Sequence, residues 1–86
     1  MRMKDGRKVA TGMCWPQGNA RDAEVFSIYE LPDSPVDGQG LRWALWLTHT
    51  AGGKALRVPM LVALTGSLRA AQNCTGADTV WYPDAA

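Results

Sequence analysis

The chain has 86 residues, of which 47% are hydrophobic and 20% are charged, and its formal net charge is +1. This length fits one domain, because a single core commonly serves about 100–150 residues. The composition excludes a disordered chain, which needs low hydrophobicity and high net charge, and the net charge does not indicate a polyanion-binding protein.

Two strands are predicted in the first third of the chain. Residues 1–6 are charged and are expected to be frayed up to a turn at Asp5-Gly6. Residues 7–15 then alternate, with Val9 and Met13 on one side and Lys8 and Cys14 on the other, which predicts a strand. After a loop at residues 16–19, residues 23–31 are rich in residues that favour β structure and predict a second strand.

A long acidic loop and a tryptophan-bearing hairpin follow. Residues 32–40 hold two prolines, two aspartates and two glycines, which excludes regular structure. Loops of this length are often functional or mobile. Residues 41–50 alternate strongly and predict a third strand, residues 51–53 a turn, and residues 54–58 a return strand.

The period of the sequence changes at Pro59. Pro59 suits the first turn of a helix, and apolar residues follow it at spacings of three and four, namely Leu61, Leu64, Leu68 and Ala71. Gly66 weakens this prediction, so a shorter helix capped by Thr65 or Ser67 is the alternative. Residues 79–82 predict a last strand. The order β-β-β-β-α-β predicts an α+β fold, a small, mostly antiparallel sheet of about four or five strands with one helix packed on one face.

Charge is distributed unevenly along the chain. Residues 1–21 carry a net +4, residues 22–37 a net −5 and residues 38–77 a net +4 without a single acid. This pattern predicts either attraction between neighbouring segments or charges solvated on opposite strands.

Cysteine and histidine are scarce. Residues 1–12 lack the apolar core of a signal peptide and no apolar run can span a bilayer, so we expect a cytoplasmic location and unpaired, buried thiols at Cys14 and Cys74. A disulfide between them is the alternative. His49 is the only histidine, and no spacing supports a catalytic or zinc site around it. We therefore expect no enzyme, no cofactor and no metal.

The hairpin over residues 41–58 has two sides. Leu41, Trp43, Leu45 and Leu47 share one side, which should be core. Trp46 and Arg42 share the other, where Trp46 is either an exposed contact residue or a second layer of core. The predicted partner-binding residues are Arg42, Trp46, Lys54, Arg57, Asp33 and Asp37.

These features favour a small protein-binding module. In size and style alone the chain resembles small phage or mobile-element inhibitors of host complexes, anti-CRISPR proteins among them, although no motif carries that resemblance. The alternative is a single-stranded nucleic-acid-binding domain that uses aromatic and basic residues on an open sheet, which the acids of residues 22–37 argue against. A protein partner is expected, nucleic acid and a homodimer are left open, and no membrane partner is expected.

Overall fold

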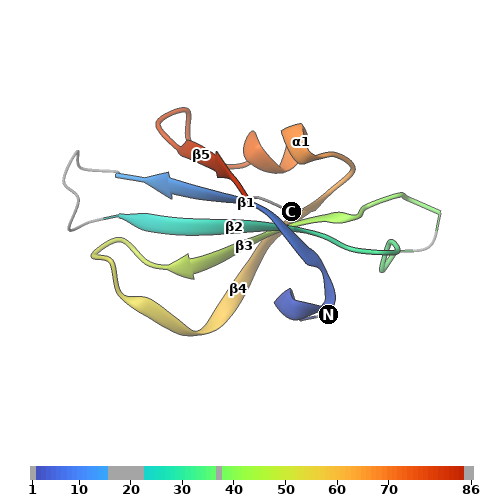
Figure 1. Cartoon of the computed structure of the whole chain (residues 1–86), viewed down its shortest axis with the longest axis horizontal. Coiled ribbons are helices and arrows are strands. Elements are labelled where there is room, and N and C mark those ends of the chain that lie inside the picture. The colour runs from blue at the N-terminus through green and yellow to red at the C-terminus, as the bar shows by residue number, and fades with distance from the viewer. Residues whose placement is uncertain (1, 16–22, 37, 85–86) are drawn as a thin grey trace.

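The computed structural model describes residues 2–15, 23–36 and 38–84. They form a twisted sheet with one short helix above it and a single 3-10 turn at the N-terminal end (Figure 1). The elements in chain order are η1 (Met3–Asp5), β1 (Arg7–Cys14), β2 (Glu24–Glu30), β3 (Trp43–His49), β4 (Ala55–Thr65), α1 (Leu68–Gln72) and β5 (Val80–Pro83).

The five strands form one sheet in the order β4-β3-β2-β1-β5. All neighbouring pairs are antiparallel. The chain moves outward by hairpins from β1 to β4, and after α1 the last strand returns to the free side of β1. The predicted α+β class and element order are therefore confirmed, and β4 and β5 are the two edges.

Both faces of the sheet carry a small core. On the face covered by α1, Ile28 and Leu45 are completely buried and pack with Ala71 of the helix. On the opposite face, Trp46 packs with Ala44 and Leu31, and partly buried residues complete the cluster, namely Met3, Tyr29 and Leu64. Because the strand period is two, neighbouring residues of β3 serve different cores.

The predicted helix over residues 59–71 is wrong in its first half. Strand β4 runs through Pro59 to Thr65, and the helix begins only at Leu68. Apolar residues at 61 and 64 suit one face of a helix, but the same run fills the open edge of β3, where Leu64 lies opposite Ala44. Pairing with β4 satisfies the backbone N–H and C=O groups on the outer side of β3, which a helix at this place would leave unpaired.

Ser67 is the N-cap of α1, as the shorter-helix alternative predicts. Its Oγ accepts a hydrogen bond of 3.0 Å from the backbone N–H of Ala70. We expect Ser67→Ala to lower the free energy of unfolding by about 1 kcal/mol, because such a cap satisfies a donor that has no partner within the helix. Thermal unfolding followed by circular dichroism checks this. An unchanged melting temperature would show that α1 does not depend on its cap.

The N-terminal segment is more ordered than predicted. Met3–Asp5 form a 3-10 turn, and the backbone N–H of Arg2 donates a 2.7 Å hydrogen bond to Asp5 Oδ2. Met3 packs against the core cluster around Trp46. A charged beginning that looks frayed in the sequence therefore covers part of the face that α1 leaves open.

Both cysteines are free, as expected, but neither is buried: Cys14 is half-buried and Cys74 is exposed. Cys74 follows α1, and its Sγ donates to the carbonyl oxygen of Ala70 at 3.2 Å. In the described part of the chain, no helix has the length and apolar character that crossing a membrane requires.

Candidate functional site: the surface around β4

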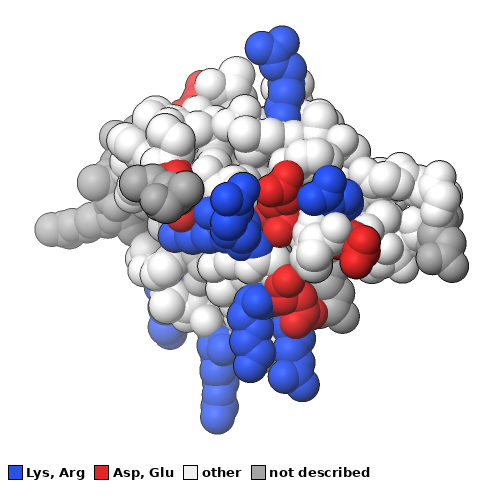
Figure 2. Space-filling view, turned by 45° about the vertical axis from the view of Figure 1, so that its right-hand side comes forward, with Lys and Arg blue, Asp and Glu red and all other residues white. Residues whose placement is uncertain are grey.

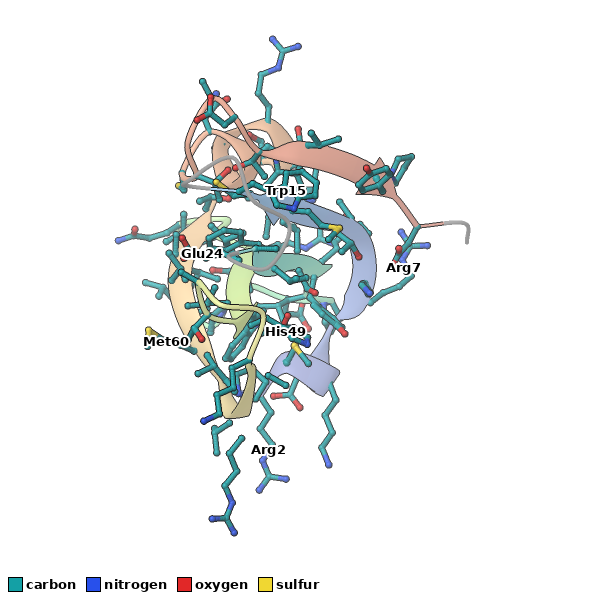
Figure 3. All side chains as sticks on the ribbon, turned by 90° about the vertical axis from the view of Figure 1, so that its left-hand side faces the viewer. Arg2, Arg7, Trp15, Glu24, His49 and Met60 are labelled. Atoms are coloured by element: carbon teal, nitrogen blue, oxygen red, sulfur yellow. The ribbon has the colours of Figure 1, made fainter. Side chains whose placement is uncertain are left out.

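The outer strand β4 carries most of the large apolar side chains that the described residues expose. Val58 is 75% exposed and Met60 is 55% exposed, and Figure 3 shows Met60 pointing away from the sheet. Leu61 and Val62 are exposed to 41% and 44%. Single exposed apolar residues are ordinary, but a row of them along one strand marks a contact surface.

The peptide groups of β4 add to this surface. Among the described residues, β4 has a neighbouring strand, β3, on one side only. An edge strand leaves about every second N–H and C=O group pointing outward, ready to pair with another strand. Hydrogen-bonding groups and apolar side chains are thus available together.

Two irregularities shape β4. Between the pairs Leu47–Met60 and His49–Ala55 the strand has four residues, 56–59, opposite a single residue of β3. A second register shift leaves Val62 without a paired residue, between the pairs Leu45–Ala63 and Trp46–Leu61. Bulges and proline are the usual means of keeping an edge strand from pairing indiscriminately. The stretch of β4 beyond the wide bulge, and open to a partner, is therefore residues 60–65, which the smaller bulge at Val62 interrupts.

A pocket of about 420 Å³ lies beside the wide bulge. Val58 and Pro59 of the bulge form one side and Trp46 contributes to its lining. The N-terminal turn supplies the remaining lining residues, namely Arg2, Met3 and Lys4. Pockets of this volume accept small molecules or large side chains. Among the described residues its lining is apolar apart from two cations and includes no acid.

Several exposed cations lie near this pocket and strand, and Asp5 is an exposed acid of the same N-terminal turn. Figure 2 shows Lys and Arg side chains projecting from the lower end of the molecule, where Figure 1 places the N-terminal turn and the bend of β4. Arg57 lies in the wide bulge and Lys54 directly precedes β4, and both are exposed. In the described part of the chain, no ion pair forms at the two cations of the pocket, Arg2 and Lys4, or at Lys54 and Arg57. We call these four cations with Val58, Met60, Leu61 and Val62 the β4 surface.

Trp46 is not an exposed contact residue. Its side chain is buried, with 6% of the residue exposed, and it belongs to the second core, which was the alternative interpretation of the sequence. Its indole N–H has no hydrogen-bond partner among the described residues. Trp46 therefore contributes to the lining of the pocket but is not the exposed aromatic contact residue that was one interpretation of the sequence.

Arg42 is engaged within the domain. Its Nε donates to the carbonyl oxygen of Leu31 at 2.9 Å, and its guanidinium lies 5.5 Å from the centre of the Trp43 ring. A longer ion pair of 3.8 Å joins it to Glu30, which also pairs with Arg7 at 3.0 Å. Glu30 thus joins an acidic segment to the basic segments on both sides, as one interpretation of the charge pattern predicts. Pairs this exposed contribute only about 0–1 kcal/mol each.

The six predicted partner-binding residues do not form one patch. Lys54 and Arg57 lie toward the turn between β3 and β4, whereas Arg42 and Asp33 lie at the other end of β3. The seven residues of β3 separate these ends, roughly 20 Å. Asp33 lines a second, smaller hollow of about 290 Å³ together with Asp5. Asp37 lies outside the described residues.

The sequence analysis missed the apolar row on β4 and the two cations of the N-terminal turn. The run Pro59-Met60-Leu61-Val62 was visible, but it was assigned to a helix whose apolar side would be buried. Its β-branched valines at 58 and 62 were the available indication of a strand.

His49 lies beside a threonine hydroxyl at the end of a strand. His49 is the last residue of β3, and its Nδ1 lies 3.1 Å from the hydroxyl of Thr48, which also donates to the carbonyl oxygen of Val25. The described residues hold no cluster of three or more histidine, cysteine, aspartate or glutamate side chains able to hold a metal ion.

Comparison of the chain with protein-family models, with curated proteins and with solved structures finds no match.

Proposed function

We propose that this chain is a protein-binding module whose contact region is the β4 surface. The observation that carries the proposal is the coincidence of an unpaired strand edge with the exposed side chains of Val58, Met60 and Val62. Addition of a strand to an exposed edge supplies main-chain hydrogen bonds, and alternate side chains supply the apolar contact. A contact of this kind needs no catalytic group.

Nucleic-acid binding is the weaker alternative. Stacking of unpaired bases needs exposed aromatic rings in a basic groove. Trp46 is buried, Trp43 and Trp81 are half-buried against the first core, and Tyr82, exposed to 51%, lies on β5, at the edge opposite the basic residues of β4. Titration with single-stranded DNA at low salt tests it, because tight and salt-sensitive binding would favour this alternative.

A pair of matched lysine substitutions tests the proposed contact. Val62 and Val80 are each 44% exposed and lie on the two opposite edge strands. A lysine in an edge strand opposes pairing with another chain. We expect Val62→Lys to weaken capture of specific proteins from the source cells by about tenfold or more, as substitution at an interface centre does.

Val80→Lys is the control for this experiment and should capture the same proteins as the unsubstituted chain. Circular dichroism should show both variants folded, since both side chains are partly in solvent already. Equal capture by the two variants would contradict a contact at β4, and loss with Val80→Lys alone would move it to β5.

Inhibition of a host complex is the use that we propose for such a module, because occupying a strand-binding site on a partner blocks it without chemistry. A cytoplasmic location fits this use. The support for it is that Cys14 and Cys74 are free, as thiols are in a reducing compartment.

A further inference from the structure

We infer that the partner of the β4 surface is an extended acidic segment that pairs with residues 60–65 and places an apolar side chain in the pocket beside the wide bulge. This inference rests on the proposed function and names the chemistry of the partner. It follows from the charge around β4, the geometry of the edge and the lining of the pocket.

Charge decides the sign of the partner. Residues 38–77, which include all of β4, contain basic residues and no acid. The cations nearest the strand, Lys54 and Arg57, form no ion pair within the described part of the chain. The pocket adds Arg2 and Lys4, again without an acid in its lining. Complementary potentials favour a partner that brings carboxylates to this edge.

The charges favour an acidic partner over a second copy of this chain. A second copy would pair through a β4 strand that contains no acid, so it would bring no carboxylate to this edge. Antiparallel pairing of two copies along residues 60–65 would also place their Arg57 side chains at opposite ends of the paired stretch. An acidic strand from another protein adds an attraction that a second β4 strand lacks.

The geometry fixes how the segment lies. The edge is open along residues 60–65, after the wide bulge ends, with the single-residue bulge at Val62 inside this stretch. Side chains of an added strand alternate between the two faces of the sheet. Leu61 pairs with Trp46, so a side chain opposite Leu61 on that face comes next to the pocket lined by Trp46, Val58 and Pro59. A segment with an apolar side chain at this position and acids at other positions would therefore suit both the apolar pocket and the cations around it.

Three synthetic peptides test the inference on the full chain. One alternates glutamate with valine, and the other two carry glutamine or lysine in place of glutamate. Binding is followed by the amide chemical shifts of the protein. We expect the glutamate peptide to bind at least about fivefold more tightly than the glutamine peptide, with shifts in residues 60–65 and the N-terminal turn. The lysine peptide should bind most weakly.

A charge reversal provides the matched variant. Arg57→Glu should weaken binding of the glutamate peptide and strengthen binding of the lysine peptide. Arg69→Glu makes the same change of charge at an exposed position on α1 and should leave the binding of both peptides unchanged. No shifts at the solubility limit, equal binding of all three peptides, or shifts confined to β5 would overturn the inference.

The oligomeric state separates this inference from the proposed function. We expect a monomer in sedimentation. A dimer that Val62→Lys dissociates would show that a second copy occupies β4 and would overturn the inference. A second result would also overturn the inference: proteins are captured through β4, but the chain does not prefer acidic peptides. The proposed function would then still stand. Capture that ignores Val62→Lys would remove the proposed function itself.

Discussion

Trp46→Ala lowers the free energy of unfolding by about 3–5 kcal/mol in our account, because it removes the largest side chain of the second core. Trp46 packs with Leu31 and Ala44 on the face of the sheet that α1 does not cover. For a domain of this size such a loss lowers the melting temperature by about 10 °C or more. Thermal unfolding followed by circular dichroism measures it.

Trp46→Phe is the control for the alanine variant. It keeps a ring in the core and removes the indole N–H, which has no hydrogen-bond partner among the described residues. Leaving such a donor unsatisfied costs about 1–3 kcal/mol, so its removal offsets part of the lost packing. Phenylalanine should therefore cost clearly less than alanine. A drop of only a few degrees for Trp46→Ala would contradict the burial of this residue.

Gly12→Ala should destabilise the other edge of the sheet by about 1–3 kcal/mol through overpacking. Gly12 on β1 lies opposite Trp81 on β5, and the indole ring covers the glycine. A methyl group at Gly12 would meet three ring carbons of Trp81 at 2.6, 2.7 and 2.8 Å. The ring must move, which loosens β5 from β1. We expect a lower melting temperature and a red-shifted tryptophan emission.

Gly66→Ala is the matched control for this substitution. No heavy atom lies within 4 Å of a methyl group at Gly66, and its backbone is not in the left-handed region. Alanine there should change stability by less than about 1 kcal/mol, because it mainly restricts the unfolded chain. Equal effects of the two substitutions would show that the contact between Gly12 and Trp81 does not hold β5 in place.

The strands were predictable because their alternation is local. The pattern of Val9, Thr11 and Met13 predicts β1, and the order of elements follows from such patterns. The length of β4 was not predictable in the same way. The spacing of Leu61 and Leu64 favours one face of a helix, and the two share a face of β4 only because the bulge at Val62 shifts the register against β3. That register is a property of the assembled sheet.

The site was predictable in its charges but not in its position. Lys54 and Arg57 were identified as exposed cations, and they are exposed. Trp46 was placed on the correct side of its strand, but its burial depends on Met3, which lies far away in the sequence and packs against the same cluster. Strand β4 is an edge because β5 pairs with β1 and not with β4. No local sequence pattern predicts which strand β5 pairs with.

Amide hydrogen exchange tests most directly whether a protein partner binds the outer edge of β4. It compares the chain alone with the chain bound to a protein captured in a β4-dependent manner. We expect new protection at residues 60–65 and no change in Val80–Pro83 on the opposite edge. Protection confined to β5 or to α1, with the amides of β4 exchanging as in the free chain, would contradict the account.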